Sequence, residues 1–322
     1  MYIPLVTDVF AVIMRLIMTV LTNNFALAII IFTVVTKLLL FPLQLKTKKS
    51  IFDQRRIAPK MQKLQKKYGN NQQKYSQELQ KLYKEENVSM FGGCLPTLLL
   101  LPILLGLYGV VYKPLTYLMS CKGHIAEIAE ILGMEYSNKV TELEIARNMV
   151  GRIAELKDAG FTKVFEMDFN FLWMNLSEMP SFSPMNLLAI LPIASGVTAF
   201  LSSWLSQKQN PMPPKPDGTP NTTGKSMLYI MPLMSVWIGF MLPAGLTLYW
   251  IVNNILSAAQ EPLLNAIAKK RYGNFTVEPE EPEKKPKPKP KPKPIIIEVD
   301  EDDEDYADYV FEDEDEDKDD EN

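Results

Sequence analysis

A lysine, Lys37, lies inside an apolar stretch, and its type and position point to a function. The run Phe25–Leu45 has the roughly 20 residues that a helix needs to cross a bilayer. Lys37 lies near its middle, where a lysine costs ~2.5–3.5 kcal/mol on insertion scales. An ionisable residue at that depth is a candidate functional site, because it favours opposite charge or water in an otherwise apolar environment.

Three explanations of Lys37 are open. Snorkelling would carry the ammonium toward the headgroups, but the nearer end of the span is roughly 12 Å away, beyond the reach of the side chain. A structural ion pair needs an acid in another span, and the nearest candidate, Glu261, is expected at a terminal turn. The third explanation, which we favour, is a water-containing groove that Lys37 faces.

Polar residues elsewhere could line the same groove. Thr33 and Thr36 lie on the same turns as Lys37. The further candidates occur in later apolar segments: Thr97, then Ser195, Thr198, Ser202 and Ser203, then Asn253, Asn254 and Gln260. Because hydroxyl and amide side chains also join packed helices in membranes, we expect some of these residues to serve only that purpose.

Enzyme and metal chemistry have little support in the sequence. One histidine, His124, and two separated cysteines, Cys94 and Cys121, are too few for a zinc site, and we expect no disulfide, cofactor or metal. An intramembrane serine protease needs a base beside its nucleophile, which His124 in a loop does not supply. We therefore expect no catalytic residues and no enzyme activity.

The apolar segments predict an all-α membrane protein with five transmembrane helices. Four runs approach or exceed the length of a span: Phe25–Leu45, Leu95–Tyr112, Met185–Leu205 and Met227–Leu264. The last run is about twice as long as needed, and Pro243-Ala244-Gly245 divides it into two spans. Another segment, Pro4–Leu21, carries Asp8 and Arg15 on one face and predicts an outer amphipathic helix. A signal sequence or an extra span is the alternative.

Charge gives the expected orientation through the positive-inside rule. Segment 46–90 has 12 Lys/Arg and four Asp/Glu, whereas 113–183 has seven and ten. We therefore expect a multi-pass protein of a bacterial cell membrane, with its N-terminus outside and its C-terminus cytoplasmic. The expected order is an outer interfacial helix at 1–22, span 1 at 23–45, a cytoplasmic hairpin at 46–90, span 2 at 92–112, an extracytoplasmic loop with a helical insertion at 113–183, span 3 at 184–205, a cytoplasmic loop at 206–226, spans 4 and 5 at 227–242 and 244–264, and a cytoplasmic tail at 265–322.

Residues 46–90 predict an antiparallel helical hairpin. Apolar positions recur at helical spacing: Ile57, Met61, Leu64 and Tyr68, and then Tyr75, Leu79 and Leu82. Gly69-Asn70-Asn71 between the two sets suits a turn, and Pro59 is expected to kink or restart the first helix. The basic outer face could bind anionic lipids, RNA or protein partners, or be a solvated surface.

The tail 265–322 has a different composition from the rest of the chain. It holds 10 Lys/Arg and 21 Asp/Glu, while the remainder holds 24 and 17, so the acidic balance of the chain comes from the tail. Lys and Pro alternate from Lys284 to Pro294, and an acidic run follows. We expect this part to be disordered beyond residue 274. Its acidic end would repel RNA.

Several motifs together resemble the YidC membrane insertase family. They are Phe91-Gly92-Gly93-Cys94-Leu95-Pro96, Leu101-Pro102-Ile103, Pro243-Ala244-Gly245-Leu246 and Leu248-Tyr249-Trp250. Lys37-Leu38 looks like the family's first span, which carries a single basic residue in a hydrophilic groove. The chain is similar to the short, Gram-positive-type form of the Oxa/Alb/YidC superfamily, because no large domain precedes the first expected span.

The resemblance implies a function without covalent chemistry or nucleotide. A groove open to the cytoplasm and to lipid would receive a hydrophilic segment of a nascent membrane protein, and Lys37 would attract its acidic groups. The apolar helix of that protein would then enter the lipid. The implied partners are nascent membrane proteins, with the ribosome, the signal recognition particle receptor, the Sec translocon and anionic lipids as further candidates and no small-molecule substrate.

Two other functions compete with this interpretation. A membrane channel or transporter is the first, but the chain shows no internal repeat of the kind that many transporters have. A passive ribosome anchor is the second. Such an anchor should tolerate charge reversal at Lys37, whereas an insertase with a basic groove should not.

Overall fold

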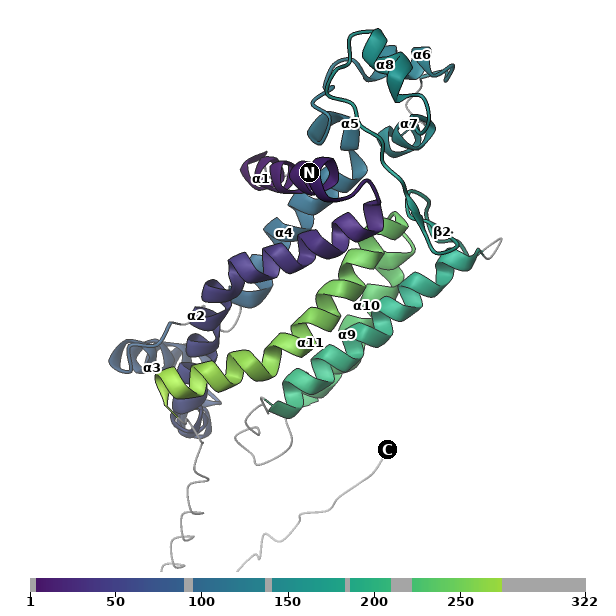
Figure 1. Cartoon of the computed structure of the whole chain (residues 1–322). Coiled ribbons are helices and arrows are strands. Elements are labelled where there is room, and N and C mark those ends of the chain that lie inside the picture. The colour runs from purple at the N-terminus through teal and green to yellow at the C-terminus, as the bar shows by residue number, and fades with distance from the viewer. Residues whose placement is uncertain (1–3, 90–94, 137–140, 183–185, 210–221, 274–322) are drawn as a thin grey trace, which may run out of the picture. The chain divides into compact units, whose positions relative to one another are not determined.

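The computed structural model of the protein describes residues 4–89, 95–136, 141–182, 186–209 and 222–273 (Figure 1). The elements in these ranges are α1 (Pro4–Leu16), the π-helix η1 (Ile17–Leu21), α2 (Phe25–Tyr68), α3 (Gln72–Glu85), α4 (Leu95–Tyr112), α5 (Pro114–Tyr117), α6 (Ile125–Ile131), α7 (Glu142–Asn148), α8 (Ile153–Asp158), β1 (Asn170–Phe171), β2 (Met174–Asn175), the 3-10 turn η3 (Leu187–Ala189), α9 (Ile190–Gln209), α10 (Thr222–Gly239) and α11 (Ala244–Tyr272). The expected disordered tail, 274–322, lies outside the described residues.

Two elements among the described residues are long and apolar enough to cross a membrane. They are α2 and the continuous segment Leu187–Gln209, formed by η3 and α9. The apolar helices Pro102–Tyr112 and Leu228–Gly239 are shorter. The helix α11 has 29 residues, but polar residues in its second half lower its hydropathy. The prediction of an all-α protein agrees with this architecture, whereas five spans remain a prediction.

The longest helix, α2, has 44 residues and passes through both Pro42 and Pro59. It begins at Asn24, whose side-chain oxygen accepts a hydrogen bond from the backbone N–H of Leu27 at 3.0 Å. At 1.5 Å per residue it is about 66 Å long, roughly twice the thickness of a bilayer core. Pro59 was expected to kink or restart the helix; the helix continues through it, so there is no restart, and the kink stays a prediction.

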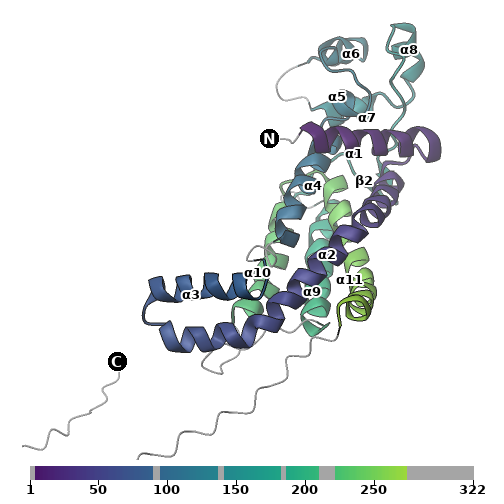
Figure 2. The ribbon, with the colours of Figure 1, turned by 90° about the vertical axis from the view of Figure 1, so that its left-hand side faces the viewer.

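The second half of α2 and α3 form a helical hairpin, which Figure 2 shows from the side. The turn between them ends at Asn71, whose side chain accepts from the backbone N–H of Lys74 at 3.0 Å. Ile57 of α2 and Leu82 of α3 are buried. The carboxylate of Glu86, just after α3, pairs with Lys60 of α2. Apolar contact and ion pairing therefore hold the two helices together.

The bundle is organised around α11, which packs between α2 on one side and α9 on the other (Figure 1). The helix α10 packs against α9, and α4 packs mainly against α1. The start of α11 comes close to neighbouring backbone, because the N–H of Gly245 donates to the carbonyl of Leu176 at 3.0 Å. A Cβ at residue 245 would lie only 2.8 Å from Cε1 of Phe25. The close approach of α2 and α11 thus depends on a residue without a side chain.

The first helix, α1, crosses the end of the bundle at a steep angle to α2 and α4 (Figures 1 and 2). Its residues Thr7 and Met14 are fully buried. The guanidinium of Arg15 donates to the carbonyl of Tyr117 at 2.9 Å and to the hydroxyl of Ser120 at 2.8 Å. Arg15 therefore fixes α1 to the segment after α4. The position of α1 in a membrane interface remains a prediction.

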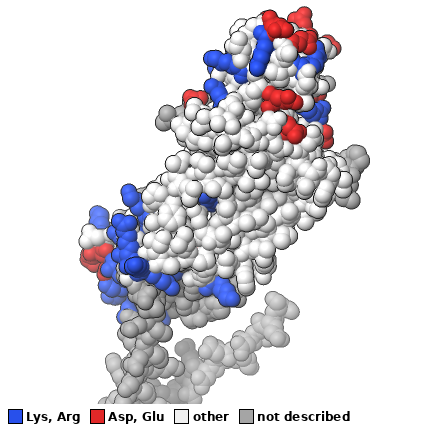
Figure 3. Space-filling view, viewed as in Figure 1, with Lys and Arg blue, Asp and Glu red and all other residues white. Residues whose placement is uncertain are grey.

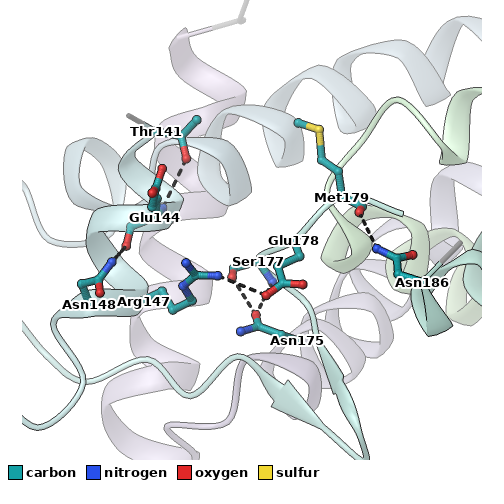
Figure 4. Close-up of polar contacts among 9 residues, drawn as sticks. All are labelled: Thr141, Glu144, Arg147, Asn148, Asn175, Ser177, Glu178, Met179 and Asn186. Carbon is teal, nitrogen blue, oxygen red and sulfur yellow. Dashed lines mark hydrogen bonds and ion pairs between the residues drawn. The ribbon is translucent and has the colours of Figure 1, made fainter. Parts of the chain in front are cut away.

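Residues 113–182 form a small region of short helices, α5 to α8, followed by the β1–β2 pair. Its buried side chains include Leu118, Met119, Ile128, Ile145, Met149 and Leu156. Figure 4 shows how α7 joins the segment after β2: the guanidinium of Arg147 lies 3.1 Å from the carboxylate of Glu178. The backbone carbonyl of Glu178 in turn accepts from the N–H of Ala244 at 2.9 Å. The region is thereby connected to the first turn of α11.

Replacing Gly245 with valine tests the close contact at the start of α11. We expect the free energy of unfolding to fall by about 1–3 kcal/mol, because the added side chain must displace Phe25 or backbone atoms of Leu176. Denaturant titration in detergent micelles measures it. Ala259→Val on the exposed side of the same helix is the matched control. Equal stability of the two variants would show that the contact is looser than described.

Candidate functional site

Lys37 of α2 makes a direct contact with α11. Its ammonium donates a hydrogen bond to the hydroxyl of Ser257 at 2.6 Å. That hydroxyl donates to the backbone carbonyl of Asn253, also at 2.6 Å. Within the described part of the chain, no carboxylate lies within ion-pair distance of Lys37. Lys37 thus keeps its charge half-buried beside a hydroxyl, with nothing described that neutralises it.

Ser257 belongs to a row of polar residues on α11. Asn253, Ser257, Glu261 and Asn265 follow one another at intervals of four, so they lie along one side of the helix. We call these four residues the α11 stripe. Each is half-buried or buried. A polar row of this kind within a packed helix bundle gives α11 a defined side for polar contacts.

A buried ion pair joins the α11 stripe to α2 a second time. The ammonium of Lys48 contacts the carboxylate of Glu261, and their side chains are only 10% and 13% exposed. The hydroxyl of Ser206 on α9 donates to the same carboxylate at 3.4 Å. The terminal turn at which Glu261 was expected is that of span 5, whose bounds stay a prediction, but the helix itself continues to Tyr272. Glu261 lies well inside the helix and contacts two of its neighbours.

Thr33 and Thr36 are bonded within their own helix. Both are buried, and their hydroxyls donate to the carbonyls of Ile29 at 2.6 Å and Phe32 at 2.9 Å. Such bonds satisfy a hydroxyl without a partner on another helix. The structure therefore does not bring these two predicted groove residues into hydrogen-bond contact with Lys37.

Ser195 and Thr198 lie where α9, α10 and α11 meet. The hydroxyl of Ser195 shares a 2.6 Å hydrogen bond with that of Ser235 on α10. The side-chain amide of Asn254 on α11 lies 3.4 Å from the hydroxyl of Thr198. These contacts join helices to one another.

The remaining predicted positions are more varied. Ser202, Ser203, Asn253 and Gln260 are half-buried. The side-chain oxygen of Gln260 is buried and has no hydrogen-bond partner among the described residues. Gly92, Gly93 and Cys94 lie outside the described residues, as do the side chains of Pro96 and Thr97. Of the other motif residues, Pro102 lies inside α4, Pro243 caps α11, Gly245 makes the close contact, Tyr249 is buried and Trp250 is half-buried.

Charged side chains leave a broad uncharged band between the two ends of the molecule (Figure 3). Basic residues gather over the hairpin of α2 and α3, and acidic and basic residues mix over the 113–182 region. Within the band, one small basic patch is visible. The described residues contain no group of three or more His, Cys, Asp or Glu side chains that could hold a metal ion. This surface is typical of a helical protein with a lipid-facing middle.

An apolar helical bundle that carries charged residues at both ends and a polar seam inside defines a membrane-embedded helical protein. Its family follows from comparison: a family model described as "60Kd inner membrane protein" matches residues 16–271, and the chain belongs to this family. This result confirms the resemblance drawn from the sequence motifs.

Relatives named membrane protein insertase YidC include that of Clostridium tetani, which is 29% identical over 270 residues, or 83% of this chain and 94% of the relative. The protein of Fusobacterium nucleatum is 27% identical over 239 residues, or 74% of this chain and 85% of the relative. That of Cellvibrio japonicus is 32% identical over 240 residues, or 74% of this chain. The match spans only 32% of this last relative. Members of the family therefore differ widely in length.

A double-mutant cycle tests the contact between Lys37 and Ser257. Ser257→Ala removes the hydroxyl, and Lys37→Met removes the charge while keeping an apolar stem. Since a hydrogen bond to a charged group contributes about 1.5–3 kcal/mol, we expect a coupling energy of about 1 kcal/mol or more from unfolding in micelles. Ser257→Thr, which keeps the hydroxyl, is the control. Purely additive losses would show that the two side chains do not interact.

Proposed function

We propose that this protein is a membrane protein insertase, which moves hydrophilic segments of nascent membrane proteins partway across the bilayer and releases their apolar helices into lipid. The observation that carries the proposal is the half-buried ammonium of Lys37, whose described partner is a hydroxyl. The names of the relatives support the same activity. A structural lysine would be expected to have a carboxylate partner, as Lys48 has.

In the proposed mechanism, Lys37 acts as an electrostatic attractor. An acidic group of the client would gain a counter-ion by approaching Lys37, and this gain offsets part of the cost of leaving water. Hydrogen-bonding groups along the α11 stripe would replace some of the water lost by the polar segment. The proposed groove lies along this seam and opens to the cytoplasm and to lipid. No covalent bond changes, and hydrophobic partitioning supplies the driving force.

The client's apolar helix needs a lipid-facing surface beside the groove. Exposed apolar side chains follow one side of α9: Ile190, Ile193, Val197, Leu201 and Trp204 are each 47–55% exposed. Their spacing of three and four residues places them in a row. We propose that the client helix passes along this row into lipid.

The hairpin of α2 and α3 is proposed to face the cytoplasm. Its excess of basic residues supports this orientation through the positive-inside rule. Nascent membrane proteins are the proposed partners. The exposed basic face of the hairpin has four candidate partners: the ribosome, the signal recognition particle receptor, the Sec translocon and anionic lipids. Negative charge or a docking surface on each of them would bind this face.

Substitutions that change the charge of Lys37 test this proposal. Purified protein in liposomes is given a small single-span client with an acidic polar segment, and the inserted fraction is measured by protease protection. We expect Lys37→Arg to retain most activity. Lys37→Ala and Lys37→Glu should lose at least about tenfold, because the acidic segment no longer meets a counter-ion.

Lys163→Ala is the matched control, since it removes an exposed lysine of the 113–182 region. Its activity should equal that of the wild type. If the Lys37→Glu protein folds and inserts the client at the wild-type rate, the attractor mechanism is wrong. That outcome would instead favour a passive anchor or another membrane function.

A further inference from the structure

Lys48 reaches the α11 stripe from the same side of α2 as Lys37. Eleven residues separate them, which is about three helical turns. On α11 their partners, Ser257 and Glu261, are also on one side. The two lysines differ in what they meet, because Lys37 contacts a neutral hydroxyl and Lys48 contacts a carboxylate. Among the hydrogen bonds and ion pairs described between α2 and α11, Lys48 thus has a carboxylate partner and Lys37 does not.

The carboxylate of Glu261 has hydrogen-bond partners besides Lys48. Ser206 of α9 donates to its carboxylate, and the amide of Asn265 lies 3.4 Å from the same oxygen. The amide of Asn265 also donates to the side-chain oxygen of Gln209 on α9 at 2.8 Å. Burial lowers the pKa of Arg55, and the negative charge of Glu261 opposes that shift. The carboxylate thus acts on two cations and is connected to two neighbouring helices, α2 and α9.

Two buried acceptors lie on the same part of α11 as Glu261. The side-chain oxygens of Gln260 and Asn265 are inaccessible and have no hydrogen-bond partner among the described residues. A buried acceptor of this kind requires a donor, such as a water molecule or a polar group of another chain. The surroundings of Glu261 are therefore suited to further polar contacts, unlike a dry apolar core.

We infer that the Lys48–Glu261 pair determines the charge preference of the α11 stripe for the client's polar segment. This inference rests on the proposed insertase function. Glu261 compensates Lys48, so this pair adds no net charge to the hairpin end of the stripe. Of the two lysines that bond to the stripe in the described part of the chain, Lys37 is then the one without a carboxylate partner. A client with acidic groups is favoured there, and the neutral Lys48–Glu261 pair adds neither attraction nor repulsion of its own.

A purely structural ion pair would behave differently. If the pair only fastens α2 to α11, breaking it lowers the insertion of every client by the same factor. If it sets a charge preference, removing one partner leaves a buried charge without compensation, and that charge attracts one kind of client and repels the other. The ratio between two clients therefore separates the two roles.

The test uses two clients with the same apolar helix, one with an acidic and one with a basic polar segment, and liposomes that contain the full-length protein. For Glu261→Gln, which leaves Lys48 without its carboxylate partner, we expect the ratio of acidic to basic client insertion to rise at least threefold. For Lys48→Met, which leaves Glu261 uncompensated by Lys48, the ratio should fall. The fall should be smaller than the rise, because Arg55 remains.

Two double variants are the controls. Lys48→Met with Glu261→Gln removes both charges, and Lys48→Glu with Glu261→Lys exchanges them, so both should give the wild-type ratio. Glu261→Gln is the single variant expected to fold most readily, because glutamine keeps the shape of the glutamate side chain. Thermal unfolding of each variant in micelles checks its fold.

The ratio decides the inference. An unchanged ratio in folded Glu261→Gln, or equal losses for both clients in both single variants, would overturn it. Wild-type protein that inserts neither client above protein-free liposomes would instead overturn the proposed insertase function itself.

Discussion

The fold depends on how one charge is accommodated inside an apolar helix. The ammonium of Lys37 lies half-buried in the apolar first half of α2, and a buried donor without an acceptor costs about 1–3 kcal/mol. The neighbouring helix α11 supplies the acceptor through Ser257, at 2.6 Å. Rotating α11 by a quarter turn about its axis would move the hydroxyl of Ser257 out of hydrogen-bond distance of Lys37. The packing of α2 against α11 is therefore constrained by polar geometry as well as by apolar burial.

The same constraint explains the unusual composition of α11. Polar side chains at every fourth position from Asn253 to Asn265 lower its hydropathy, so α11 does not pass as a span by composition alone. Each of these groups needs a partner from a neighbouring helix, and the helices α2 and α9 on its two sides provide Lys48, Ser206 and Gln209. A helix with such a polar row needs other helices on its polar sides. The helix α11 has this central position, between α2 and α9.

Sequence reasoning located the elements better than the contacts between them. Length, apolar runs and the turn at Gly69–Asn71 were sufficient to predict a predominantly helical fold, and the motifs were sufficient for the family. The importance of Lys37 followed from the cost of its burial. Its partner did not follow, because the rotation of α11 relative to α2 cannot be derived from either helix alone. Thr33, at a helical interval from Lys37, is nonetheless buried and bonded to Ile29. The spacing of four along α11 was a signal for Ser257 and Glu261 that went unused.

The rotation of α2 relative to α11 is fixed at both ends of their contact. At one end, the backbone of Asp168 bonds to Asn23 and Phe25 at the start of α2, and Leu176 bonds to Gly245 at the start of α11. Only eight residues of chain separate Asp168 from Leu176, so the 113–182 region holds both helix starts together. At the other end, Lys48 pairs with Glu261. Lys37 and Ser257 lie between these two fixed points, where the geometry allows a polar contact that neither helix could maintain alone.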